Sequence, residues 1–152
     1  MTDAILLADI QRAIAAAPDG HEAMVETVAL LRARLPHYTW AGIYVLEGDE
    51  LVLGPYLGKP SPHTRIPLGR GICGAAAAER ATIVVDDVHS DPRYLACSIE
   101  TRSEIVVPIM TAGANSRVLG ELDIDSDRPA AFGQSDRDLL EAVAALLAPR
   151  LA

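Results

Sequence analysis

Residues 39–57 decide the fold, and they read Thr-Trp-Ala-Gly-Ile-Tyr-Val-Leu-Glu-Gly-Asp-Glu-Leu-Val-Leu-Gly-Pro-Tyr-Leu. The first nine are rich in Trp, Ile, Tyr and Val, which are residue types enriched in β-strands. Gly48 and Asp49 are turn residues, although they stand in the reverse of the favoured Asp-Gly order. The stretch therefore predicts a β-hairpin whose strands span 39–47 and 50–57.

Helical patterns precede this hairpin and close the chain. Apolar residues recur at helical spacing over 4–16 and over 21–35, and Pro18-Asp19-Gly20 separates the two segments. A last helix is predicted to begin near Ser135, with Asp138 three residues on as its capping partner. The chain therefore has a predicted pair of N-terminal helices and one C-terminal helix.

Shorter elements fill the middle of the chain. An alanine-rich stretch over 73–80 predicts a short helix, and 81–85 predicts a strand. A long irregular stretch over 86–102 follows, and 103–111 with 117–126 predicts a second hairpin. This order predicts an α+β fold, in which the N-terminal helix pair and the C-terminal helix pack on one side of an antiparallel sheet.

Composition limits the classes of function. The 152 residues, half of them apolar, suit a single domain over 1–152 with one core. A formal net charge of −8 disfavours nucleic acid and anionic membranes as partners. No apolar run approaches the roughly 20 residues that cross a bilayer. Two cysteines are too few for a secreted disulfide scaffold and no basic leader is seen, so we expect a cytoplasmic protein.

The two cysteines and a set of acids carry the chemistry. Cys73 lies in a glycine-rich turn, and Cys97 lies in the long irregular stretch. Asp123 and Asp125 alternate with apolar residues, so they share one face of a predicted strand, and Glu104 lies on its hairpin partner. Like charges at this spacing raise the pKa of at least one carboxyl group. Thiols beside clustered carboxyl groups predict redox chemistry on a small polar molecule.

Each of these residues also has a purely structural interpretation. A free cysteine is commonly a small buried apolar residue, and alternating acids commonly form a solvated strand face. The position of Cys73 before a predicted helix could lower its thiol pKa through the helix N-terminus. No cysteine and histidine spacing resembles a zinc site, and the glycines at 69, 71 and 74 make no nucleotide-binding motif. We therefore expect no metal and no cofactor.

Eight short segments, in this order and spacing, carry a family resemblance: 39–44, 53–59, 65–67, 69–74, 87–89, 96–97, 103–106 and 122–126. Together they resemble the free methionine-(R)-sulfoxide reductases, which are single-domain members of the GAF fold. The resemblance extends from about residue 20 to residue 148 of the chain.

The resemblance implies an activity and a set of site residues. It implies thiol-dependent reduction of free methionine-(R)-sulfoxide by a homodimer that a thioredoxin-type protein recycles. Cys97 matches the catalytic nucleophile and Cys73 a second redox cysteine of the family. The residues that match the substrate-binding positions are Glu104, Asp123, Asp125, Trp40 and Tyr44.

One segment departs from the family pattern. The family usually carries a further cysteine in the loop before Arg65, and that loop here reads Pro60-Ser61-Pro62-His63-Thr64. His63 cannot replace a thiol that forms a disulfide. An alternative interpretation is therefore a non-catalytic GAF module that binds or senses a small molecule.

Overall fold

The computed structural model describes residues 2–96 and 99–152. Its described elements lie in the order α1 (Thr2–Ala16), α2 (Gly20–Arg34), β1 (Trp40–Glu47), β2 (Glu50–Leu57), β3 (Arg65–Pro67), α3 (Gly71–Glu79), β4 (Ile83–Val85), a 3-10 turn (Val88–Ser90), β5 (Ser103–Met110), β6 (Val118–Ser126) and α4 (Gln134–Leu151). The strands form one antiparallel sheet in the order β3-β2-β1-β6-β5-β4. Both predicted hairpins are therefore confirmed.

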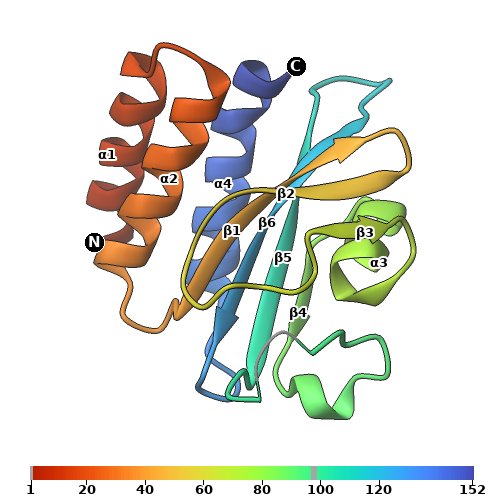
Figure 1. Ribbon diagram of the computed structural model, residues 1–152. Helices are drawn as coiled ribbons and strands as arrows, with labels where there is room; N and C mark the ends of the chain where they lie inside the picture. The colour runs from red at the N-terminus through yellow and green to blue at the C-terminus, as the bar shows by residue number, and fades with distance from the viewer. Residues whose placement is uncertain (1, 97–98) are drawn as a thin grey trace.

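Helices α1, α2 and α4 cover one face of the sheet, and α3 lies against the other face (Figure 1). The main core lies under the three long helices and is built from aliphatic residues of α1, α2, α4 and the central strands. The predicted α+β class, with these three helices on one side, is confirmed. The short helix packs opposite because its buried Ile72, Ala76 and Ala77 join the smaller apolar cluster on that side.

The start of α4 differs from the sequence prediction. The N-cap residue is Gly133, whose backbone N–H donates to Oδ2 of Asp136 at 3.0 Å, so the predicted pairing of Ser135 with Asp138 is wrong. The other oxygen of Asp136 accepts a hydrogen bond from the Tyr38 hydroxyl at 2.9 Å. Because Asp136 bonds the chain just before β1 as well, a long-range contact fixes where α4 begins.

The two hairpins meet at the middle of the sheet. Strand β1 pairs with β6 so that Gly42 lies opposite Asp123 and Ala41 opposite Ile124. On the other side, β6 pairs with β5 so that Asp125 lies opposite Glu104. This register places the predicted acidic side chains next to one another across two central strands.

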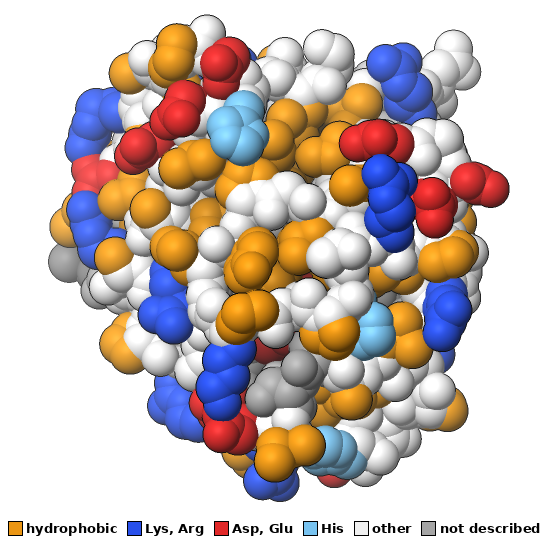
Figure 2. All heavy atoms as spheres, in the orientation of Figure 1, with side chains coloured by type: hydrophobic (Ala, Val, Ile, Leu, Met, Phe, Trp, Pro, Cys, Tyr) orange, Lys and Arg blue, Asp and Glu red, His pale blue; other side chains and the backbone are white. Residues whose placement is uncertain are grey.

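Two features concern the outside of the molecule. Within the described residues, no helix has the length and apolar character that a membrane span requires. Figure 2 shows acidic and basic side chains interspersed on the face that it presents. On this face, the net negative charge is not concentrated in one patch.

Candidate active site

Side chains of strand β6 alternate between the two faces of the sheet, with apolar residues on one face and acids on the other. Leu122 and Ile124 point into the helix-covered core, and Glu121, Asp123 and Asp125 point to the face that carries α3. The three acids are only 0%, 3% and 3% exposed, respectively, and Glu104 on β5 is 5% exposed. Burying four carboxyl groups side by side is energetically unfavourable unless they hold protons or bind a cationic partner.

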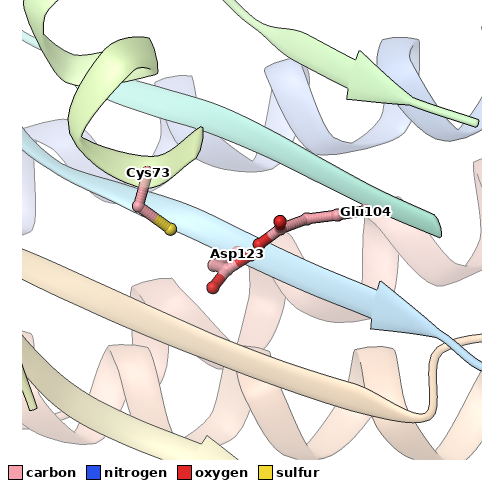
Figure 3. A group of neighbouring side chains, drawn as sticks. All are labelled: Cys73, Glu104 and Asp123. Atoms are coloured by element: carbon pink, nitrogen blue, oxygen red, sulfur yellow. The ribbon is translucent and has the colours of Figure 1, made fainter. Parts of the chain in front are cut away.

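Helix α3 brings a thiol to these acids. Cys73 lies in the first turn of α3, is 6% exposed and has a free thiol. Figure 3 shows its sulfur directed from α3 toward Asp123 on β6 and Glu104 on β5. Ligand atoms of these three residues all lie within 4.8 Å of one another, a grouping that could also hold a small cation. The expectation of no metal stays a prediction.

A small cavity lies at this point. It has a volume of about 20 Å³ and is lined by Tyr44, His63, Ile66, Gly71, Ile72, Cys73, Leu95, Glu104 and Asp123. Gly71 has a φ of +68°, and a Cβ atom there would lie 2.8 Å from a methyl carbon of Leu95. Glycine at this position therefore lets Leu95 cover the cavity closely while α3 begins.

Burial dominates the electrostatics of the carboxyl groups. The pKa of Glu104 is raised well above its usual value, first by burial and then by the charges of Asp123 and Asp125. Burial also raises the pKa of Asp125 and, against hydrogen bonds from Glu104 and Cys73, the pKa of Asp123. The predicted upward shift is therefore confirmed, with desolvation as its main cause. Carboxyl groups of this kind can keep and donate protons near neutral pH.

The Cys73 thiol differs from the sequence prediction. Its pKa is raised well above the usual value, first by burial and then by Asp123, Glu121 and Glu104. The prediction that the helix N-terminus lowers this pKa is therefore wrong, because burial first, and then the nearby negative charges, raise it. A thiol held protonated in this way is a weak nucleophile until a base removes its proton.

The chain resembles known proteins along most of its length. The model of the GAF domain family matches residues 19–151. Free methionine-R-sulfoxide reductase from Escherichia coli K12 is 41% identical over 129 residues, which cover 85% of this chain and 76% of that protein. The structure of the free methionine-R-sulfoxide reductase from Neisseria meningitidis, solved with its substrate, superimposes with a TM-score of 0.89 at 39% identity and covers 96% of this chain and 86% of the other.

This chain belongs to the free methionine-R-sulfoxide reductases of the GAF domain family. The type II reductase of the same name from Thermoplasma acidophilum is also similar in structure, with a TM-score of 0.81 and 39% identity, covering 87% of this chain and 92% of that one. The resemblance drawn from short motifs is thus confirmed.

The two aromatic residues expected in the reductase pocket lie on one face but reach different cavities. Tyr44 lines the small cavity, and its hydroxyl donates to the His63 carbonyl at 2.7 Å. Trp40 stacks on Tyr56 at a centroid distance of 5.6 Å, and its Nε1 donates to the Lys59 carbonyl at 2.9 Å. Trp40 instead lines a larger cavity of about 540 Å³, together with Arg32, Thr39, Gly58, Lys59, Glu100, Thr101, Asp125 and Asp127.

Cys97, the predicted nucleophile of the reductase, lies outside the described residues. The described residues just before it are at the site: Leu95 lines the small cavity, and the Ala96 carbonyl lies 3.0 Å from Nε2 of His63. The loop that lacks the usual family cysteine therefore contacts the segment that leads to Cys97.

Sequence reasoning missed Glu121. It is fully buried, it shares the face of Asp123, and no N–H or O–H group among the described residues hydrogen-bonds to its oxygens, although the Cys73 thiol favours its ionised form. The signal was present, because a strand that places residues 123 and 125 on one face places residue 121 there too. The family motif begins one residue later, at Leu122, and so did not include Glu121.

Proposed function

We propose that this protein reduces free methionine-(R)-sulfoxide to methionine, with Cys97 as nucleophile and Cys73 as the thiol that resolves the oxidised enzyme. One observation carries the proposal. A buried thiol and two carboxyl groups of raised pKa meet within 4.8 Å at one cavity, in a chain of this reductase family. Together they offer the proton donors and the second sulfur that the reaction needs.

In the first step, the thiolate of Cys97 attacks the sulfur of the sulfoxide. The oxygen leaves the substrate sulfur, methionine is released, and Cys97 becomes a sulfenic acid. A carboxyl group of the Glu104, Asp123 and Asp125 cluster donates a proton to the sulfoxide oxygen, since burial raises the pKa of all three groups and so favours their protonated forms. A carboxylate of the same cluster binds the substrate ammonium group.

In the second step, the Cys73 thiol condenses with the sulfenic acid, which gives a disulfide and water. The raised pKa of Cys73 suits this order, since a protonated buried thiol does not compete with Cys97 for the substrate. Cys73 also takes over the role that the loop over 60–64, which has no cysteine, cannot fill. A thioredoxin-type reductant then reduces the disulfide and completes the cycle.

The volumes of the two cavities limit how a substrate amino acid can reach the site. The small cavity has room for about one water molecule, so an amino acid reaches Cys73 and Asp123 only after covering residues such as Leu95 move. The larger cavity admits an amino acid, and Asp125 and Trp40 line it. Because Asp125 is the register partner of Glu104, a substrate ammonium group held by Asp125 lies beside the proton donors.

A turnover assay with thioredoxin, thioredoxin reductase and NADPH tests this function on the purified R and S epimers of free methionine sulfoxide. We expect turnover of the R epimer and none of the S epimer. Cys97→Ser should abolish methionine release, whereas Cys73→Ser should release one equivalent and then stop. A wild-type protein that releases no methionine from the R epimer contradicts the proposal.

Calorimetry distinguishes a reductase from the alternative, a non-catalytic GAF module. Binding of the sulfoxide by the reduced wild-type protein without release of methionine would identify a module that binds or senses this molecule. Light scattering of the same samples tests the further proposal that the protein is a homodimer.

A further inference from the structure

The larger cavity, of about 540 Å³, carries charged groups of both signs on its wall. Two cations, Arg32 and Lys59, line it together with three acids, Glu100, Asp125 and Asp127. Lys59 and Glu100 form an ion pair. Arg32 forms no ion pair with any of the described residues. The cavity therefore has a guanidinium group on its wall that the described part of the chain does not neutralise.

Arg32 is held in place at one end of its guanidinium group. It lies in the last turn of α2 and is half-buried, and its Nε donates to the Thr39 carbonyl at 3.0 Å. Its two terminal nitrogens have no hydrogen-bond partner among the described residues. Arg34, two residues further along α2, instead pairs with Asp9 at 2.9 Å. Because the terminal nitrogens of a guanidinium group match the two oxygens of a carboxylate, Arg32 is suited to bind such an anion in the cavity.

An acceptor for a cation lies close to Arg32 on the same wall. The backbone N–H and the hydroxyl of Thr39, whose carbonyl holds Arg32, donate to the Asp125 carbonyl at 3.0 Å and 3.1 Å. The Asp125 side chain is 3% exposed and lines the same cavity, and no N–H or hydroxyl group of the described residues donates to its Oδ1. A ligand with an ammonium group and a carboxylate on one carbon atom would satisfy both Asp125 and Arg32.

We propose that Arg32 binds the carboxylate of the substrate and so selects the free amino acid over methionine sulfoxide inside a peptide chain. This inference rests on the proposed function, in which the acidic cluster binds the substrate ammonium group. The terminal nitrogens of Arg32 donate to the two carboxylate oxygens, while its Nε keeps the Thr39 carbonyl. A residue inside a peptide chain has neither charge, so it leaves Arg32 and Asp125 without partners. Sites with polar groups that a ligand leaves unpaired reject that ligand strongly.

The other charged groups of the cavity are less suited to this role. The Lys59 ammonium group is 65% exposed and already paired with Glu100. Asp127 would repel a carboxylate, but it is exposed, so water weakens this repulsion. Its Oδ1 also lies 3.4 Å from the Thr39 hydroxyl, which donates to it. Arg32 is therefore the cation of this wall that a substrate carboxylate reaches without breaking an ion pair.

The test compares free methionine-(R)-sulfoxide with its amide, in which a neutral carboxamide replaces the carboxylate. At a pH where both ammonium groups are protonated, wild-type kcat/KM should be roughly 10- to 100-fold higher for the acid. Arg32→Gln should raise the KM for the acid by about the same factor, with kcat within about twofold, and should leave the KM for the amide almost unchanged. The preference for the acid should therefore disappear. Arg34→Gln, the matched change outside the cavity, should keep it.

The ratio of the two substrates separates binding from a structural role. If Arg32 only supported the fold through Thr39, Arg32→Gln would weaken both substrates equally, and that result would overturn the proposal. Arg32→Lys should recover part of the preference, since it keeps the positive charge but not the two parallel hydrogen bonds. An unchanged preference in Arg32→Gln would also overturn it.

Calorimetry on Cys97→Ser distinguishes this inference from the proposed function, because binding is then measured without turnover. The sulfoxide should bind more tightly than its amide, and adding Arg32→Gln should remove the difference. This result, beside a wild-type protein that does not reduce the sulfoxide, would support the role of Arg32 and reject the reductase activity. Turnover by the wild type, with the same preference for the acid in Arg32→Gln, would reject the role of Arg32 and leave the reductase activity standing.

Discussion

The two faces of the sheet differ in what they bury. The face under α1, α2 and α4 buries almost only hydrocarbon, whereas the face under α3 buries four carboxyl groups and a thiol. Strand β6 contributes to both, since Ile124 and Asp123 are neighbours in the chain with opposite orientations. The helix-covered face therefore provides stability, which the other face uses to hold groups that would be more stable in water. The proposed site and the apolar core are separated by a single residue step along one strand.

The largest expected effect is on activity, at Asp123. Asp123→Asn keeps the size of the side chain but removes an acid from the cavity, so we expect kcat/KM to fall by about 10²-fold or more. The thermal midpoint should not fall, since a neutral side chain next to Glu104 removes a repulsion. Steady-state kinetics and calorimetry measure both. Full activity in Asp123→Asn would break the division between the two faces.

Ile124, the next residue along β6, should show the reverse: its substitution should lower stability and leave substrate binding unchanged. Ile124 is 1% exposed in the helix-covered core, and Ile124→Ala should cost about 2–5 kcal/mol in the free energy of unfolding. The substrate KM should stay unchanged at temperatures where the variant is folded, because the side chain points away from the acids. Urea unfolding gives the stability. A changed KM with unchanged stability would contradict the division.

Removing the Glu121 carboxyl group should make the protein more stable. Glu121→Leu replaces, with hydrocarbon, a buried carboxyl group to which no N–H or O–H group of the described structure hydrogen-bonds, so we expect about 1–3 kcal/mol of stabilisation. Glu121→Gln, which keeps a buried polar group, should gain less. Urea unfolding of the two variants beside the wild type is the measurement. A loss of stability in Glu121→Leu would indicate that Glu121 supports the fold.

The last expected effect concerns the dependence of stability on pH. The folded-state pKa values of Glu104, Glu121 and Asp125 are raised above their unfolded values, so above pH 4 the folded protein holds protons that the unfolded chain has released. The stabilising effect of these groups is complete below their unfolded pKa values and is lost as pH rises through the folded ones. Stability should therefore fall from pH 5 to pH 8, by up to about 1.4 kcal/mol per pH unit for each proton.

Urea unfolding across this range measures the slope, and Asp123→Asn provides the control. The Asp123 charge is one cause of the raised pKa values of Glu104 and Asp125. Asp123→Asn should therefore lower these pKa values and make the slope of stability against pH shallower. A wild-type protein whose stability rises between pH 5 and pH 8 would show that the buried acids are ionised and paired.

Much of this architecture could be predicted from local patterns. Alternation and turn residues predicted both hairpins, and period-two spacing placed Asp123 and Asp125 on one face. The direction of the Cys73 pKa shift could not be predicted, because it depends on burial and on acids some 30 to 50 residues away in sequence. The start of α4 also required a long-range contact, the hydrogen bond from Tyr38 to Asp136. Glu121 was accessible to the same spacing argument as Asp123 and was missed.

The pairing of β1 with β6 has a consequence for how the protein is made. Gly42 and Asp123 lie opposite each other but are about 80 residues apart in the chain, so the centre of the sheet closes late in synthesis. Cys73 leaves the ribosome well before the strand that carries the acids. For that interval the nascent chain has a thiol without the carboxyl groups that later bury and restrain it. Oxidants in the cell meet this sulfur first as an ordinary exposed cysteine.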